Sequence, residues 1–182
     1  MEGVRVLAVA KPHLPCGARG RAVAPLDSPP ITVTVVIEIP RGSFLKRGSN
    51  GHIDFVSPLP CPFNYGSVPA YIGGEGDLLD ALVLGPRLAR GTEITVPAWG
   101  AIGLSERYMY DDKLICAERA PSVGRCRQIL RFFRVYARCK GMLNALRGQR
   151  GAARCEGWGS AAKAIESAIP TGDEGPRPQI EF

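Results

Sequence analysis

Short apolar segments rich in β-branched residues follow one another between residues 31 and 118, with no helical period between them. The predicted strands lie at 31–40, 80–86, 91–106 and 111–118. Residues 41–57 are typical of a hairpin with its turn at Ser49-Asn50-Gly51. Residues 57–69 contain four prolines, so we expect an ordered loop there. Five or six short strands leave exposed edges unless the sheet closes on itself, which predicts a small closed barrel.

Helical periodicity begins only after residue 122. One face of the first predicted helix carries Arg127, Arg131, Arg134 and Arg138, and the opposite face carries Ile129, Phe133, Tyr136 and Lys140. Gly141 is a plausible end of this helix, and a second helix is predicted from about residue 160 to Pro170. The fold class is therefore mainly β with α, an α+β barrel followed by two helices. Residues 31–170 would form the domain, between a poorly ordered extension at 1–30 and a disordered tail at 171–182.

Composition excludes several classes of protein. The longest apolar run, at 31–37, is too short to cross a membrane. The six cysteines form no C-x-x-C pair and no zinc-type cluster with the two histidines, so we expect free buried thiols in a reducing cytoplasm.

Positive charge is concentrated in the segment that follows the predicted barrel strands in the sequence. Residues 119–154 carry ten Lys or Arg and no acidic residue. A barrel with a basic helix could be a nucleic-acid-binding protein, which is one rival interpretation. The arginine face lacks interleaved aromatic residues, however, so we expect a solvated helix face and no specific nucleic-acid partner.

Two acidic turns precede apolar strands. Glu75, Asp77 and Asp80 place three carboxylates within six residues, and a second turn holds Glu106, Asp111 and Asp112. Carboxylates this close repel one another unless some are protonated or a cation neutralises them. Oxygen ligands in this number favour Mg²⁺, with Mn²⁺ as a substitute, although a solvated acidic turn is the alternative.

Cations and phenols accompany these acids. Glu38 lies inside an apolar strand, where a lone carboxylate indicates a polar cavity. Lys46, Lys113, Tyr65 and Tyr136 are candidate ligands of an anion. Acids for a metal together with cations for an anion are what phosphoryl chemistry needs.

The chain resembles the soluble family I inorganic pyrophosphatases. The resemblance rests on "VVIEIPRGSFLK", "PFNYGSVP", "GEGDLLDALVL", "DDKL" and "FFRVYARCKG…EGW", in the family's order and spacing. It implies a five-stranded OB-type barrel flanked by two helices, and Mg²⁺-dependent hydrolysis of pyrophosphate to two orthophosphates. It also implies a cytoplasmic, homo-oligomeric enzyme without membrane partners.

The resemblance implies a role for each candidate. Asp77 would be the general base. The implied metal ligands are Glu75, Asp80, Glu106, Asp111 and, through water, Glu38. The implied phosphate ligands are Lys46, Tyr65, Lys113 and Tyr136.

The sequence departs from the family pattern at several of these positions. Glu75 and Glu106 replace aspartates, Leu78 replaces the proline of the acidic signature, and "HIDFV" stands where an arginine is expected. Ala137 replaces a lysine, and we predict that Lys140, one turn after Tyr136, supplies part of the lost clamp, whereas Arg138 faces solvent. The alternatives are a related phosphoanhydride hydrolase with another substrate, or a catalytically impaired homologue that acts as a binding protein.

Overall fold

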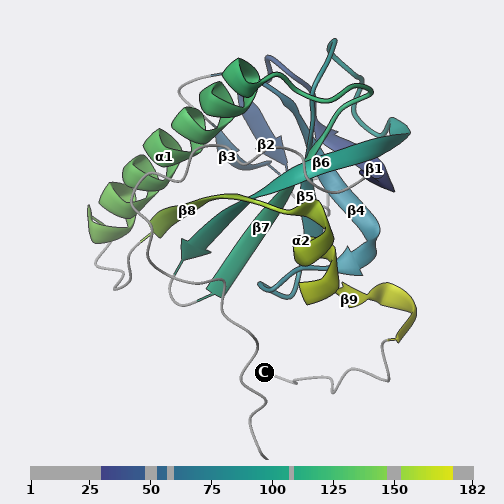
Figure 1. The fold of residues 1–182 in the computed structure, drawn as a ribbon. Helices are drawn as coiled ribbons and strands as arrows, with labels where there is room; N and C mark the ends of the chain where they lie inside the picture. Colours follow the sequence, from purple (N-terminus) through teal and green to yellow (C-terminus); the bar gives the residue numbers. More distant parts are fainter. Residues whose placement is uncertain (1–29, 48–52, 57–59, 107–108, 147–152, 174–182) are drawn as a thin grey trace, which may run out of the picture.

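Five strands form a closed ring in the computed structural model, which describes residues 30–47, 53–56, 60–106, 109–146 and 153–173. The strands are β1 (Ile31–Ile39), β4 (Asn64–Ile72), β5 (Leu78–Val83), β7 (Met109–Cys116) and β6 (Glu93–Glu106). They are hydrogen-bonded in that order, and β1 pairs with β6 to close the ring (Figure 1). Only the β5–β7 pair is parallel among these five neighbouring pairs. The predicted five-stranded closed barrel is confirmed.

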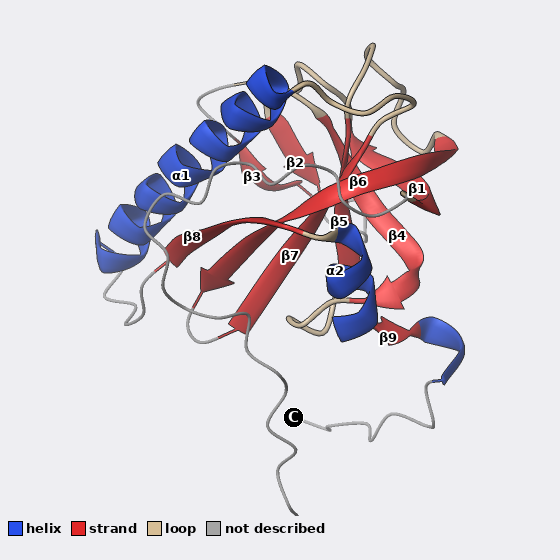
Figure 2. Cartoon of the chain, in the orientation of Figure 1, coloured by secondary structure: helices blue, strands red, loops and turns tan. Residues whose placement is uncertain are grey.

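The remaining elements attach to this barrel (Figure 2). The short strands β2 (Leu45–Arg47) and β3 (Ile53–Val56) pair as the predicted hairpin, whose turn lies outside the described residues. The strand β8 (Ala153–Gly159) extends the sheet beyond β6, and β9 (Ile169–Pro170) pairs with β4. The two predicted helices are present as α1 (Val123–Leu146) and α2 (Ala161–Ser167). A 3₁₀ turn, η1 (Thr171–Asp173), continues the structure into the segment that we expected to be disordered.

Two local expectations were wrong. We expected an ordered loop at 57–69, but residues 64–72 form β4, with Pro69 inside the strand. Pro69 is exposed, and the register shifts between Val68 and Ile72. The N–H that proline lacks is therefore missing at an irregular point of the ladder. The helix α1 also continues past Gly141 to Leu146. A helical glycine costs only about 1 kcal/mol relative to alanine, and packing of α1 on β8 outweighs that cost.

The core has two parts that lie on opposite faces of the strands. The barrel interior contains buried side chains from all five strands, and Ala161 and Ala164 of α2 cover one part of this cluster. On the outer face, α1 packs Ile129, Leu130 and Phe133 onto a second cluster that includes Leu82 and Ile115. The predicted solvent face of α1 is exposed, with Arg127, Arg131, Arg134 and Arg138 all on the surface. Because side chains alternate along a strand, Leu79 and Ala81 point inward whereas Asp80 lies on the outer face beside the α1 contact.

No helix in the described part of the chain is both long and apolar enough to cross a membrane. The cysteines in that part are free thiols, as predicted, but only Cys116 and Cys126 are buried; Cys61 and Cys155 are half-buried and Cys139 is exposed. Cys116 lies inside the barrel, where burial raises the pKa of its thiol to about 12.

Asn64 fastens two loops to the start of β4. It is fully buried, and its Oδ1 accepts hydrogen bonds from the backbone N–H groups of Arg41 (3.0 Å) and Leu88 (2.9 Å). Its Nδ2 donates to the carbonyl oxygens of Val83 (3.2 Å) and Pro86 (2.8 Å). Both donors and both acceptor directions of the amide are therefore used, which makes this position specific for asparagine.

The substitution Asn64→Asp should lower the free energy of unfolding by about 3 kcal/mol, because a buried carboxylate would face two carbonyl oxygens that have lost their donors. Urea denaturation measures the change. Gln128→Glu makes the same amide-to-acid change at an exposed position of α1 and should have little effect. Equal stability of the two variants would contradict this role for Asn64.

Candidate active site

Strand register brings the two acidic turns together. In the parallel β5–β7 pair, Asp80 lies opposite Lys113. Asp111 precedes Lys113 by two residues, so the period of a strand places both side chains on one face. On the other side of β5, Ser67 of β4 lies opposite Asp80, and Tyr65 is two residues before Ser67. The outer face of three neighbouring strands therefore presents these polar side chains together.

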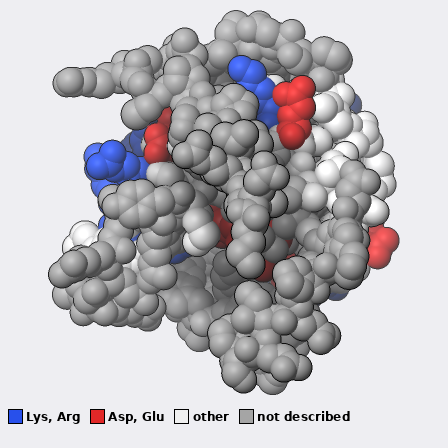
Figure 3. Space-filling view, turned by 90° about the horizontal axis from the view of Figure 1, so that it is seen from below, with Lys and Arg blue, Asp and Glu red and all other residues white. Residues whose placement is uncertain are grey.

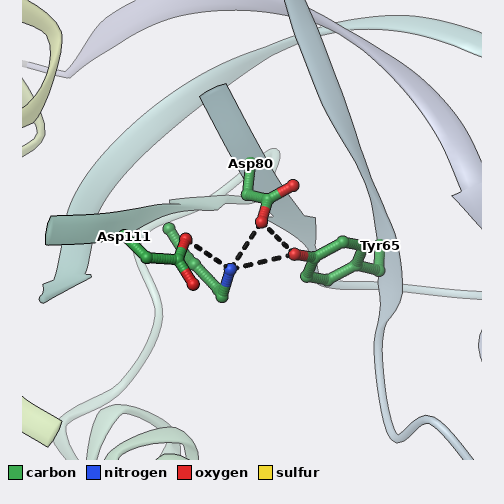
Figure 4. A network of polar contacts seen from close by, with 4 residues as sticks. Tyr65, Asp80 and Asp111 are labelled. Carbon is green, nitrogen blue, oxygen red and sulfur yellow. Dashed lines mark hydrogen bonds and ion pairs between the residues drawn. The ribbon is translucent and has the colours of Figure 1, made fainter. Parts of the chain in front are cut away.

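Lys113 lies at the centre of a polar network that it forms with Tyr65, Asp80 and Asp111 (Figure 4). Its Nζ donates to Asp80 Oδ2 at 2.5 Å, to Asp111 Oδ1 at 2.7 Å and to Tyr65 Oη at 3.0 Å. The Tyr65 hydroxyl in turn donates to Asp80 Oδ2. We call these four residues the Lys113 network. Both ion pairs found among the described residues belong to it.

The charge of the Lys113 ammonium is stabilised by its partners. Only 5% of the residue is exposed. Burial opposes the charge, but the oxygens of Tyr65, Asp80 and Asp111 outweigh burial and raise the pKa of Lys113 well above its usual value. Burial also raises the pKa of Tyr65, with the Asp80 and Asp111 charges acting in the same direction and Lys113 against them, so this phenol stays protonated and can donate.

Glu75 lies at the rim of the network, in the turn before β5. Hydrogen bonds from Gly73 N to Asp77 O (2.7 Å) and from Gly76 N to Gly73 O (3.1 Å) close this turn, and Gly76 has a φ of 91° that favours glycine. Partial desolvation and the Asp111 charge raise the pKa of Glu75, whereas Lys113 and Lys140 lower it. Glu75 is therefore electrostatically part of the site although its side chain is exposed.

Asp77 lies in the turn that holds Glu75, and Glu38 lies in β1. Asp77 is exposed, and no hydrogen bond or ion pair to its side chain occurs within the described ranges. Glu38 accepts a hydrogen bond at 2.8 Å from the hydroxyl of Ser67, the register partner of Asp80. Glu38 therefore joins the outer face of the barrel through β4. Lys46 and Glu106 lie in β2 and at the end of β6, and their side chains are outside the described part, so their roles stay predictions.

The helix α1 contributes a second wall. A small cleft is lined by Leu104, Ser105, Asp111, Tyr136, Ala137, Lys140, Ala153 and Arg154. Lys140 Nζ lies 6.0 Å from the centre of the Tyr136 ring, and Ala137 is buried between helix and sheet. Arg138 is exposed and does not line the cleft. The structure thus brings Tyr136 and Lys140 to Asp111.

Sequence reasoning missed Ser67 and Arg154. Ser67 could have been found, since it follows Tyr65 by two residues in a strand and so shares its face. Arg154 reaches the cleft because β8 pairs with β6, where it lies opposite Ser105. That pairing joins segments about 50 residues apart, and no local pattern in the sequence indicates it.

The donor atoms of this site suit a hard divalent cation. They are carboxylate oxygens, which Mg²⁺ and Mn²⁺ prefer, and oxygens of Asp80 and Asp111 converge on one point, Lys113 Nζ. Within the described residues, no group of three or more Asp, Glu, His or Cys side chains is already arranged to hold an ion. The acids therefore fit a metal by their chemistry, and small movements would have to complete its coordination. Figure 3, which views the molecule from below, shows some Asp and Glu atoms near the middle of that face.

Comparisons with known proteins identify relatives over the same residues. A family model described as inorganic pyrophosphatase matches residues 35–169. The inorganic pyrophosphatase of Gluconobacter oxydans is 31% identical over 102 residues, which is 52% of this chain and 59% of that protein. That of Saccharolobus solfataricus is 33% identical over 105 residues, which is 53% of this chain and 61% of that protein. The chain thus spans about three fifths of the length of these curated relatives.

Solved structures give the same result for the fold. The inorganic pyrophosphatase of Coxiella burnetii superposes with a TM-score of 0.60 at 26% identity, over 76% of this chain and 93% of that one. The inorganic pyrophosphatase of Thermus thermophilus gives the same TM-score and identity, over 85% of this chain and 91% of that one. Because the family model covers most of the domain and these structures share its architecture, the chain belongs to the inorganic pyrophosphatase family.

Proposed function

We propose that this protein hydrolyses inorganic pyrophosphate to two orthophosphates with the help of Mg²⁺, which Mn²⁺ could replace. The observation that carries the proposal is the Lys113 network: two strand carboxylates, a phenol and an ammonium lie together on one face of a barrel of this family. Carboxylates can hold the metal, and the cation and phenols can hold phosphate oxygens. A cytoplasmic location and a homo-oligomeric state also stay predictions.

Each residue has a proposed task. Glu75, Asp80 and Asp111 would hold the metal, with Glu38 acting through water and Glu106 as a further ligand. The bound ion would neutralise phosphoryl oxygens and lower the pKa of the attacking water. Asp77 would accept a proton from that water while the water oxygen forms a bond to one phosphorus atom. The bond between that phosphorus and the bridging oxygen would break, and the other phosphate would leave as orthophosphate. Lys46, Tyr65, Lys113, Tyr136 and Lys140 would bind the phosphate oxygens.

The decisive experiment measures phosphate release from pyrophosphate by the whole chain, in Mg²⁺ and in excess chelator. Asp80→Ala, purified in the same way, controls for contaminating phosphatase. We expect release that requires the metal and is lost in Asp80→Ala. Absence of release from the parent protein, or equal release from the variant, would reject the proposal.

The differences from the family pattern among the proposed phosphate ligands favour one alternative, a related phosphoanhydride hydrolase with another substrate. Ala137 lies in the cleft where the family has a lysine, so the phosphate-binding end differs in charge. Assays with tripolyphosphate and nucleoside triphosphates would identify a related phosphoanhydride hydrolase. Inactivity on all of them, with intact Mg²⁺ binding, would instead support an impaired homologue that acts as a binding protein.

Lys140→Ala should raise the KM for pyrophosphate about tenfold, or about 1.4 kcal/mol. The side chain lines the cleft beside Asp111 and Tyr136, and its charge lowers the pKa of Glu75, so it lies close enough to act on an anion bound there. Steady-state kinetics at saturating Mg²⁺ measure the effect. Arg138 is exposed on the solvent side of α1, so Arg138→Ala is the control and should change KM little. The reverse ranking would show that the wrong cation was assigned.

A further inference from the structure

The ammonium of Lys113 has no hydrogen-bond donor to spare. A lysine ammonium carries three N–H groups. In Lys113 these are matched by three acceptors, namely Asp80 Oδ2, Asp111 Oδ1 and Tyr65 Oη. The residue is also almost fully buried, so it cannot turn to solvent without breaking these contacts. In this state Lys113 is therefore engaged by the carboxylates that would bind the metal, and it cannot at the same time make full contact with an anion.

A metal and this ammonium also compete for the same oxygens. An ion held by Asp80 and Asp111 would lie within a few ångströms of Lys113 Nζ, because that atom is 2.5 Å and 2.7 Å from the two carboxylates. Like charges at this separation repel strongly in a site shielded from water. The carboxylates can satisfy the metal only if the ammonium gives up at least one of them.

We propose that Lys113 is the counter-ion of the metal-free site, and that the metal displaces it from the carboxylates and so frees it for the substrate. The inference rests on the proposed function, because it takes a divalent cation as the ligand of Asp80 and Asp111. It sets an order of events: the metal binds first, and the released ammonium then binds a phosphate oxygen. It also explains how the two acids stay close together without a metal.

Calorimetric titration of MgCl₂ into Lys113→Met, without substrate, tests the inference directly. Removal of the competing cation should tighten Mg²⁺ binding at least about tenfold. The melting temperature without metal should fall, because Asp80 and Asp111 would face each other uncompensated, and Mg²⁺ should raise it more than in the parent protein. Lys163→Met, an exposed lysine of α2, is the matched control and should leave both quantities unchanged.

The outcomes separate the inference from the proposed function. Equal Mg²⁺ affinity, or weaker affinity, in Lys113→Met would overturn the counter-ion role and leave the pyrophosphatase proposal standing. A lack of Mg²⁺ binding in both proteins would overturn both. If Lys113→Met does not fold without metal, Tyr65→Phe serves instead. This substitution removes one hydrogen-bond acceptor of the Lys113 ammonium and one donor to Asp80. The ammonium is then held less firmly, so Mg²⁺ should bind about threefold tighter. Unchanged Mg²⁺ affinity would reject the inference.

Discussion

Asp77→Asn should lower the turnover number for pyrophosphate by about 10²-fold or more, because an amide cannot accept the proton of the attacking water. Asn has the size of Asp, and the Asp77 side chain is exposed and is not among the four residues of the Lys113 network. The substitution should therefore leave Mg²⁺ binding and the melting temperature nearly unchanged. This combination of lost turnover and retained metal distinguishes a base from a ligand.

The test combines steady-state kinetics with calorimetric titration of Mg²⁺ on the same preparation. Glu118→Gln replaces another exposed acid, one that follows β7 and lies outside the site, and should keep full turnover. If Asp77→Asn keeps its turnover, Asp77 is not the base. If it loses Mg²⁺ as well as turnover, Asp77 is a ligand and the base is another group.

Gly66→Ala should lower the free energy of unfolding by about 4 kcal/mol or more, a loss typical of severe overpacking. A Cβ atom at this position would lie 2.0 Å from the carbonyl oxygen of Val36 and 2.8 Å from its carbonyl carbon. Both are backbone atoms of β1, so the β1–β4 pair would have to separate. Tyr65 and Ser67 flank Gly66, and the site would be displaced with the strand.

Urea denaturation, or the yield of folded protein if the variant is too unstable, measures this loss. Gly124→Ala is the matched control, since its added Cβ would meet only Ser122 Oγ at 3.9 Å in the first turn of α1. There the methyl group should be neutral or stabilising by up to about 1 kcal/mol. A Gly66→Ala protein as stable as the parent would mean that β1 and β4 do not pair as the structure shows.

Local pattern was sufficient to predict a closed barrel and the helices, although β4, one of the five barrel strands, lies largely in a segment that we expected to be a loop. Alternating and β-branched segments between turns predict strands, and a sheet of short strands removes its edges by closing. The arginine spacing in 127–138 predicted the solvent face of α1 correctly. The errors at Pro69 and Gly141 share a cause, because both residues disfavour the element that contains them, and pairing with β5 or packing on β8 outweighs that preference.

Several residues of the candidate site could be predicted from the sequence, but the way they contact one another could not. Acidic spacing indicates Glu75, Asp80 and Asp111 as neighbours of a cation. Nothing in the spacing shows that Lys113 contacts both Asp80 and Asp111, since this requires the register of a parallel pair whose strands are separated by β6 in the chain. A shift of one residue in that register would turn Lys113 into the barrel.

The parallel β5–β7 pair has a consequence for how the candidate site is assembled. The strand β7 follows β6 in the chain, so Asp80 meets Lys113 only after the whole segment between them has been synthesised and folded. Ring closure between β1 and β6 joins residues that are even farther apart in the chain, such as Ile31 and Ala98, and non-local pairings of this kind fold slowly. Until β7 has left the ribosome, the nascent chain contains the first acidic turn but cannot yet pair Asp80 with Lys113. The Lys113 network should therefore form in one late step of biosynthesis, together with the cooperative formation of the barrel.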